Sequence, residues 1–467
     1  MLRRSLIIAA ALAGASVVAV APATAGQYVA PAGSGALFLI DGHGWGHGVG
    51  MSQWGAEGYA QHAYTYEQIL AAYYPGTALG QTPMKTIRVP LAERKTLKLS
   101  SDQPITVTGA DGVEHTLPAG VTKLTAALDL AVDGGPAQPL EPPLTFAPSA
   151  GSYLTLGRSY RGKIVVDVSG KRLQAINVLP LEQYLLGVVP AEMPSTWLSG
   201  ALEAQAVASR SYAVATRRVA APFDVYSDTG GQLYLGVSAE TPAATAAVAA
   251  TAGEVLFYGD EVATTFFSSS SGGRTQAASD AWGGQSIPYL PSVPDPYDTL
   301  SPYHDWGPVP VPANRLARAL DVPGRVLDAT TTINPSKRVV ELDVSSLVRG
   351  SETTTPVAGS LVQGRLDLRS TWFRVDVLSL QPPEPNPAVA PGTKVELTGL
   401  IRGAPGAVVQ ERTAGGPWSA FHRPKPNPAT HAFTLVVRPK ATTWYRLAVP
   451  AATSGSIRIL VDPDIAQ

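Results

Sequence analysis

One carboxylate in the sequence is set apart by the prolines around it. Glu192 lies between Pro190 and Pro194, in an apolar run that leads into a helix-like segment. Proline fixes φ and lacks an amide proton, so we expect a rigid, non-helical turn here. A carboxyl group on such a turn loses hydration, which raises its pKa toward the range used in general acid–base catalysis. An acid that only precedes a helix and interacts with its dipole explains the residue equally well.

A second segment alternates glycine with bulky polar and aromatic residues. Every second residue from Gly42 to Gly50 is glycine, so the backbone can adopt positive φ and another chain can approach closely. A metal site formed by His43 and His47 would need a helix, which the glycine content disfavours. The segment therefore predicts a substrate wall or a structural turn, and we expect no bound metal.

A third segment, residues 266–275, is a strand that breaks into serines followed by Gly272 and Gly273. Serine hydroxyls and free backbone amides in such a turn suit the binding of sugar hydroxyls. A serine nucleophile is the competing interpretation, but the G-x-S-x-G pattern is absent and no acid–histidine pairing is readable.

Helices and strands must position these groups. An alanine-rich helix is predicted from Leu198 to about Arg218, and it carries Gln205, Ser209 and Tyr212 on an otherwise apolar stripe. These three residues either face a site or are hydrogen-bonded within the core. A further helix is predicted at 66–74, where Pro75-Gly76 ends it. Another is predicted at 241–250, where an alanine-rich run ends at Ala250.

The rest of the chain is β-rich. Short alternating segments separated by turn residues run from 87 to about 176, and strand patterns return between 255 and 378. Residues 381–387 are proline-rich and predict a stiff linker. Strand patterns without a helix then predict a small β-sandwich. We expect an α+β fold with these parts: a signal peptide at 1–25, a main domain at 26–380 (with segments 36–80, 85–160 and 161–380), the linker at 381–387 and the sandwich at 388–467.

Composition excludes several classes of protein. The chain has 467 residues, 45% of them hydrophobic and 15% charged, which suits a buried core and argues against wholesale disorder. The net charge of −1 implies no basic patch, so we expect no nucleic-acid partner. The absence of cysteine excludes disulfides, thiolate metal sites and cysteine nucleophiles.

The first residues have the pattern of a secretory signal peptide. Arg3 and Arg4 precede an uncharged apolar run, and Ala23-Thr24-Ala25 follows as a small-residue cleavage site. A membrane anchor is the alternative, but the run is shorter than the ~20 apolar residues that a span needs. We therefore expect a secreted or cell-wall protein with no integral membrane span after signal removal.

The motifs together resemble the SpoIID/LytB family, the group of stage II sporulation protein D and the amidase enhancer. The resemblance covers roughly residues 38–380 and rests on several motifs at once: LEQYLLGVVPAEMP at 181–194, AQAVASRSYA at 204–213, SSGGRT at 270–275, PYLPSVPD at 288–295, LDLRSTWF at 366–373 and GHGVGMSQWGA at 46–56.

This resemblance implies a peptidoglycan lytic transglycosylase that cleaves β-1,4 bonds between N-acetylmuramic acid and N-acetylglucosamine in strands stripped of stem peptides. Its catalytic glutamate corresponds to Glu192, acting alone as acid and base. We expect His47, Gln53 and Tyr212 to bind substrate beside it. The groove wall is expected from Ser270, Ser271 and Gly272, with Arg210 and His43 one shell out.

Two departures from the family pattern affect these expectations. The Gly-His-Gly block usually follows the Leu-Arg-Ser-Thr strand, whereas here it precedes the whole domain, which a fold tolerates when its termini lie close together. Some members bind zinc through cysteines near the Ser-Gly-Gly turn. This chain has no cysteine, and it has Ser268 where a histidine could stand, so we expect no zinc and no cofactor.

Two functions remain open from the sequence. The first is the enzyme described above, acting on peptidoglycan glycan strands. The second is a non-catalytic glycan-binding activator of a cell-wall amidase. A purely structural envelope protein is disfavoured because it leaves the Gly-His-Gly block without a role.

Overall fold

The computed structural model describes residues 27–33, 35–228 and 230–465. The described residues divide into two compact units: unit 1 comprises 47–300, and unit 2 comprises 27–46 together with 301–465. Each unit has cores of its own, and the chain passes between them once inside the Gly-His-Gly block and once after Leu300. The predicted signal peptide lies outside the described residues.

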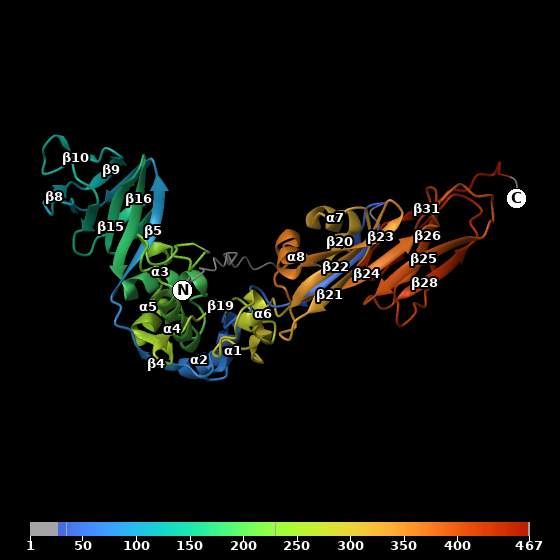
Figure 1. The fold of residues 1–467 in the computed structure, drawn as a ribbon, viewed down its shortest axis with the longest axis horizontal. Coiled ribbons are helices and arrows are strands. Elements are labelled where there is room, and N and C mark those ends of the chain that lie inside the picture. The colour runs from blue at the N-terminus through green and yellow to red at the C-terminus, as the bar shows by residue number, and fades with distance from the viewer. Residues whose placement is uncertain (1–26, 34, 229, 466–467) are drawn as a thin grey trace. The chain divides into compact units, whose positions relative to one another are not determined.

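Unit 1 contains the helices that carry the predicted site (Figure 1). The side chain of Ser52 caps the first helix by accepting from the Gly55 amide, Thr65 and Gln68 form a capping box on the second, and Thr241 caps the fifth. The three helices predicted from sequence are therefore confirmed, with slightly shorter bounds. The helical segments are α1 (Gln53–Gln61), α2 (Tyr66–Tyr73), α3 (Leu181–Glu192), α4 (Ser199–Ala215), η1 (Gly236–Ala239), α5 (Pro242–Ala250), α6 (Ala278–Trp282) and η2 (Asp298–Leu300).

The predicted non-helical turn around Glu192 is wrong. Helix α3 includes Pro190 and ends at Glu192, and the extended cap residue Met193 follows. Proline removes one backbone hydrogen bond from a helix. Here that loss falls in the last turn, where few further helical bonds depend on it.

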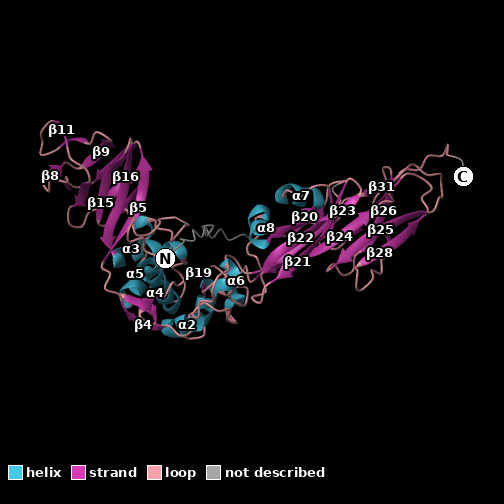
Figure 2. Ribbon diagram, viewed as in Figure 1, coloured by secondary structure: helices cyan, strands magenta, loops and turns pink. Residues whose placement is uncertain are grey.

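Strands and turns between the helices of unit 1 build several sheets (Figure 2). One sheet has the order β5-β16-β15-β12-β7-β8, a second has the order β14-β13-β6-β9, and smaller ones are β18-β17-β4, β19-β3 and β10-β11. The bounds are β3 (Met51–Ser52), β4 (Ala78–Gln81), β5 (Thr86–Arg94), β6 (Thr96–Ser101), β7 (Ile105–Thr108), β8 (Glu114–Leu117), β9 (Gly120–Thr125), β10 (Asp129–Ala131), β11 (Ala137–Pro139), β12 (Leu144–Pro148), β13 (Leu154–Leu156), β14 (Arg158–Tyr160), β15 (Lys163–Ser169), β16 (Arg172–Pro180), β17 (Glu254–Tyr258), β18 (Glu261–Val262) and β19 (Phe267–Ser268).

Unit 2 is built around the sheet β20-β2-β24-β25-β28, which is covered on both faces. Alternation along β2 explains this, because Phe38 and Ile40 belong to one core cluster while Leu37 and Leu39 belong to the other. The remaining sheets are β1-β30-β29-β26-β27, with β31 paired to β29, and β21-β22-β23.

The elements of unit 2 have these bounds: β1 (Tyr28–Val29), β2 (Leu37–His43), β20 (Asp305–Pro312), α7 (Ala313–Leu320), β21 (Arg325–Ile333), β22 (Val339–Val348), β23 (Ser351–Ala358), α8 (Gly359–Leu366), β24 (Phe373–Gln381), β25 (Val395–Arg402), β26 (Val408–Thr413), β27 (Ser419–His422), β28 (Ala432–Val437), β29 (Thr443–Ala448), β30 (Ala452–Thr453) and β31 (Ile457–Ile459). The predicted α+β class, rich in strands, is confirmed.

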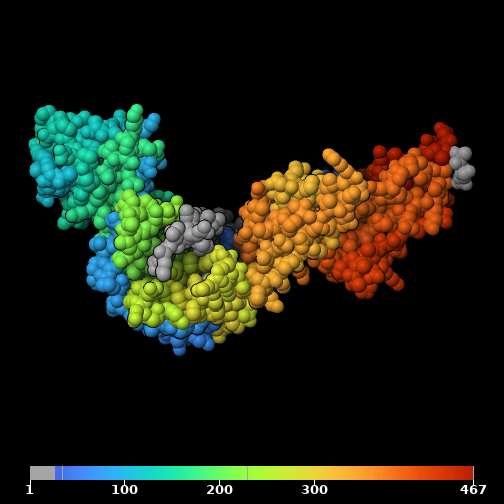
Figure 3. Space-filling model, in the orientation of Figure 1, coloured from blue at the N-terminus to red at the C-terminus, as the bar shows by residue number. Residues whose placement is uncertain are grey.

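The C-terminal strands differ in their partners from the separate sandwich expected from sequence. Strand β25 pairs with β24 on the other side of the proline-rich segment, and Leu378 and Leu380 share a core cluster with Leu397 and Leu435. In Figure 3 the surface of unit 2 is continuous from the residues near 350, in orange, to the C-terminal residues, in red. The proline-rich segment is therefore a loop within unit 2. The proline content of a segment indicates its local stiffness, but it does not indicate which strands pair on either side of it.

Among the described helices, none is long and apolar enough to cross a bilayer.

Candidate active site

The predicted catalytic residue, Glu192, is the last residue of α3 in unit 1. Its Oε1 accepts a hydrogen bond of 2.7 Å from the backbone amide of Leu233, which lies 41 residues later in the chain. The residue keeps part of its surface accessible, while protein surrounds most of its carboxyl group. Such a group is held in one orientation and remains reachable from solvent.

Burial gives this carboxyl group an unusual affinity for protons. Desolvation of the charged form raises the pKa of Glu192 from its ordinary 4.5 to about 7, and the hydrogen bond from Leu233 opposes part of that rise. A carboxylic acid with a pKa near neutrality holds its proton for donation and accepts one back as a carboxylate. Glu192 therefore has the properties of a general acid–base group.

Gln53, the first residue of α1, lies against the end of α3. Its Nε2 donates to the backbone carbonyl of Glu192 at 2.9 Å and also contacts Oε1 of Gln205 at 3.3 Å. Gln205 in turn donates to the hydroxyl of Ser209, one turn further along α4. The amide of Gln53 is thus engaged in holding the backbone of Glu192, and two of the polar residues on the α4 stripe are hydrogen-bonded within the core.

Tyr212 and His47 both contact the ring of Phe266 in unit 1. The pKa of Tyr212 is raised, first by burial and then by the negative charge of Glu192. Its ring meets Phe266 at a centroid distance of 5.7 Å, and the ring of His47 meets Phe266 at 6.1 Å. His47 Nδ1 accepts the amide proton of Val49, which fixes the imidazole.

The Gly-His-Gly block is the connection between the two units. Gly44 and Gly46 donate to backbone carbonyls of unit 2, whereas Gly48 donates to Ser268 in unit 1. Positive φ values, from 71° to 100°, occur at Gly44, Gly46, Gly48 and Gly50. The structural-turn interpretation therefore accounts for this glycine pattern.

His43 belongs to unit 2, whereas Glu192 belongs to unit 1. Its Nδ1 lies 2.6 Å from a carboxylate oxygen of Asp305, and its ring centroid lies 4.8 Å from that of Trp372. Both His43 and Asp305 line an open cavity of about 580 Å³ within unit 2. No group of three acidic or histidine side chains suited to a metal ion occurs among the residues that the structure describes.

The Ser-Ser-Gly turn is held by two buried aspartates. Asp298 accepts from the hydroxyl of Ser270 and from the amides of Ser271 and Gly272, at 2.9–3.0 Å. The hydroxyl of Ser271 donates to Asp295 at 2.7 Å. The sequence predicts these residues as the wall of a substrate groove, but the structure buries them and engages their polar atoms internally.

The same aspartate joins this turn to α1. The hydroxyl of Ser52, the capping residue of α1, donates to Asp298 at 2.7 Å. Two motifs separated by more than 200 residues are therefore connected through the carboxylate of Asp298. The spacing of residues in the sequence does not indicate that Asp298 accepts hydrogen bonds from both.

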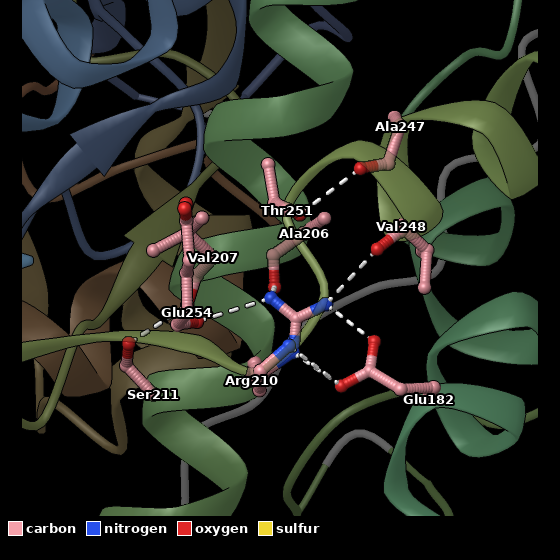
Figure 4. A network of polar contacts seen from close by, with 10 residues as sticks. Glu182, Ala206, Val207, Arg210, Ser211, Ala247, Val248, Thr251 and Glu254 are labelled. Atoms are coloured by element: carbon pink, nitrogen blue, oxygen red, sulfur yellow. Dashed lines mark hydrogen bonds and ion pairs between the residues drawn. The ribbon is translucent and has the colours of Figure 1, made fainter. Parts of the chain in front are cut away.

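Arg210 stabilises the other end of α3 (Figure 4). Its guanidinium is fully buried and forms a bidentate ion pair with Glu182 in the first turn of α3, at 2.9 and 2.7 Å. It also donates to the carbonyls of Val248 on α5 and Glu254 on β17. The predicted supporting role of Arg210 thus takes the form of a cross-link among four elements.

Sequence reasoning missed the segment that completes the site. Leu233 contributes only its backbone amide, so no side-chain pattern marks it. Gln232 lies beside it and is almost fully buried. The rings of Trp54 and Trp197, near the first residue of α1 and the end of α3, meet at a centroid distance of 4.7 Å in a tilted arrangement. The glycine pair before Gln232 indicates that another part of the chain can approach the backbone closely here. Many glycine pairs in loops share this property, so the signal is not specific to a functional site.

Comparison with known proteins supports the family resemblance over part of the chain. Residues 169–258 match the family model for stage II sporulation protein SpoIID. Stage II sporulation protein D of Bacillus subtilis (strain 168) is 38% identical over 146 residues, covering 28% of this chain and 42% of the relative. The amidase enhancer of the same organism is 38% identical over 122 residues, covering 26% of this chain and 16% of the relative.

An uncharacterized protein of Brachyspira hyodysenteriae is 35% identical over 140 residues, covering 29% of this chain and 38% of the relative. The chain thus spans less than half the length of the curated relatives it matches. No solved structure matches it. The matched segment contains α3, α4, Glu192, Arg210 and Tyr212, and over this segment the chain is similar to the SpoIID/LytB family.

Proposed function

We propose that this protein is an exported peptidoglycan lytic transglycosylase, and that Glu192 is its single catalytic acid and base. The bond cleaved is the β-1,4 link between N-acetylmuramic acid and N-acetylglucosamine in glycan strands stripped of stem peptides. The observation that carries the proposal is the buried Glu192 carboxyl with its pKa of about 7. A role at the cell wall is supported by the family and by the relatives named above.

The surroundings of Glu192 suit a mechanism with one carboxyl group. Glycoside hydrolases generally place a second carboxyl group roughly 5–9.5 Å from the first. Among the described residues, no acidic side chain perturbs the pKa of Glu192. A transglycosylase needs no second acid, because the substrate supplies the nucleophile.

The reaction then has two proton transfers through one residue. Protonated Glu192 donates its proton to the glycosidic oxygen as the C1–O bond of the muramic acid residue breaks, and the N-acetylglucosamine chain leaves with a free hydroxyl. The resulting carboxylate accepts the proton of the C6 hydroxyl as that oxygen attacks C1. The product carries a 1,6-anhydro end, and Glu192 is protonated again.

Substitution of Glu192 by glutamine tests this proposal. Glutamine is nearly isosteric and keeps the acceptor for Leu233, but it has no proton of suitable acidity. We expect release of 1,6-anhydro fragments from peptide-free strands, measured by mass spectrometry, to fall by about 10²–10⁴-fold while strand binding persists. Glu114→Gln, at an exposed position of β8, is the matched control and should leave cleavage unchanged. Full cleavage by the Glu192 variant would assign the acid to another residue.

The alternative is a glycan-binding activator of a cell-wall amidase, which the match to the amidase enhancer favours. In that case neither the wild type nor the Glu192→Gln variant would cleave strands, while both would bind them and stimulate an added amidase equally.

A further inference from the structure

A buried side-chain amide beside the proposed catalytic residue lacks part of its hydrogen bonding. Gln232 is 1% exposed, and its Oε1 accepts from the hydroxyl of Tyr184 at 3.3 Å. Its Nε2 has no partner within the part of the chain that the structure describes. Reversing the amide would leave the oxygen without a partner in place of the nitrogen, so one polar atom stays unsatisfied in either orientation. Buried polar groups of this kind are rare, because their desolvation is not repaid.

Gln232 lines a small pocket with aromatic walls. The pocket has a volume of about 110 Å³, and the rings of Tyr184, Tyr212 and Tyr226 form part of its lining. A cavity needs roughly 10–15 Å³ of this volume to hold one water molecule, so the space has room for a small organic substituent.

The charged residues that line this pocket are already engaged with the protein. Asp224 forms a bidentate ion pair with Arg88, and Arg218 stacks on the rings of Phe223 and Tyr226. The amide of Gln232 is therefore a buried polar group of this lining that a small, uncharged ligand can satisfy.

Residues of the pocket are linked to the Glu192 carboxyl group through the chain. Leu233, which donates to Glu192 Oε1, directly follows Gln232 in the chain. Tyr184 and Tyr212 line the pocket, and the negative charge of Glu192 contributes to the raised pKa of both.

We infer that this pocket is a subsite for the acetamido group of an N-acetylated amino sugar, and that Gln232 is the residue that recognises it. The inference rests on the proposed function, because that function places the sugar C1 at Glu192 and its C2 acetamido group beside it. A substrate amide matches Gln232 in either orientation, since both amides carry a donor and an acceptor. The tyrosine rings accommodate the methyl group.

The inference makes Gln232 a determinant of specificity. A de-N-acetylated sugar carries an ammonium group, which has no carbonyl for the Gln232 amide and no methyl group for the aromatic wall. Sites built to hydrogen-bond a substrate group discriminate strongly against analogues that lack it.

The test compares two probes on the full-length chain. Oligomers of N-acetylglucosamine and their fully de-N-acetylated counterparts are titrated against the Glu192→Gln protein by calorimetry, so that binding is measured without turnover. We expect the acetylated oligomer to bind about tenfold tighter or more, and Gln232→Met, introduced into the same protein, to reduce that preference to about twofold. Gln232→Leu is a second variant in case the methionine protein does not fold, and Gln103→Leu, at an exposed position, is the matched control that should retain the preference.

Each outcome separates this inference from the proposed function. Equal or absent binding of both oligomers overturns the inference, even where the wild type cleaves strands, and means that the pocket holds water only. A preference that survives both Gln232 substitutions also overturns it. A preference that depends on Gln232 supports the inference even where the wild type forms no 1,6-anhydro product, a result that would overturn the proposed function alone.

Discussion

At the scale of single residues, the central observation is a carboxyl group whose proton affinity depends on its burial. Leu233 holds one oxygen of Glu192, and Gln53 holds its backbone carbonyl. Neither contact neutralises a carboxylate with a full positive charge, so desolvation dominates and the pKa is raised to about 7.

This raised pKa predicts a pH-dependent effect of Glu192→Gln on stability. Between pH 4.5 and about 7 the folded state binds the proton more tightly than the unfolded state does, so the contribution of Glu192 to stability falls as the pH rises through this window. The cost at pH 8 is on the order of 3 kcal/mol. We expect the glutamine variant to gain stability relative to the wild type between pH 5 and pH 8, as measured by urea unfolding. A difference that is the same at both pH values would contradict the raised pKa, and Glu114→Gln serves as the control.

At the scale of elements, α3 is fixed at both ends. Arg210 holds Glu182 in its first turn (Figure 4). Gln53 holds its last residue. The orientation of Glu192 therefore depends on α1 and α4, which pack on α3 directly or through these side chains.

This arrangement predicts that Arg210→Lys destabilises unit 1. Lysine keeps the charge but cannot reproduce the bidentate pair or the hydrogen bonds to Val248 and Glu254. Breaking a buried ion pair costs about 3–5 kcal/mol when one partner is lost, and we expect about 2–4 kcal/mol for this partial loss. The measurement is the free energy of unfolding from denaturant titration. Arg172→Lys, in a half-exposed pair with Glu93, is the control and should cost at most about 1 kcal/mol; equal losses in the two variants would contradict the cross-link.

At the scale of the whole molecule, the chain forms two units with separate cores. The large cluster of unit 1 draws only on residues between Val49 and Leu290, while both clusters of unit 2 combine residues before 46 with residues after 305. Unit 1 is a continuous segment of chain, and unit 2 is closed by its N-terminal strands.

Two fragments test this division. We expect a fragment of residues 47–300 to unfold cooperatively and to retain strand cleavage, because its core is complete. A chain ending at Leu380 should lose the cooperative unfolding of unit 2, because it lacks β25 and β28 and much of the shared cluster with Leu378. Unfolding of both proteins is measured by calorimetry, and cleavage by the release of 1,6-anhydro fragments. A chain ending at 380 that unfolds like the full chain would indicate an independent C-terminal sandwich.

Local features of this protein follow from its sequence. The sequence is enough to predict helices α2, α4 and α5, the strand-rich segments and the positive-φ glycines. Capping residues, hydrophobic spacing and glycine determine the conformation of residues only a few positions away in the chain. The motif around Glu192 also marks that residue without a structure, although its two prolines suggest a turn where a helix forms.

Only the tertiary structure decides which distant groups meet. The partners of Glu192 lie 41 and 139 residues away, and the serines expected to face a groove are turned inward by two aspartates. Strand β25 joins β24 across a proline-rich loop, since pairing depends on the hydrophobic faces that two strands can bury together. Burial and long-range hydrogen bonds set the pKa of a carboxyl group, and both depend on the three-dimensional surroundings, which the neighbouring residues in the chain do not specify.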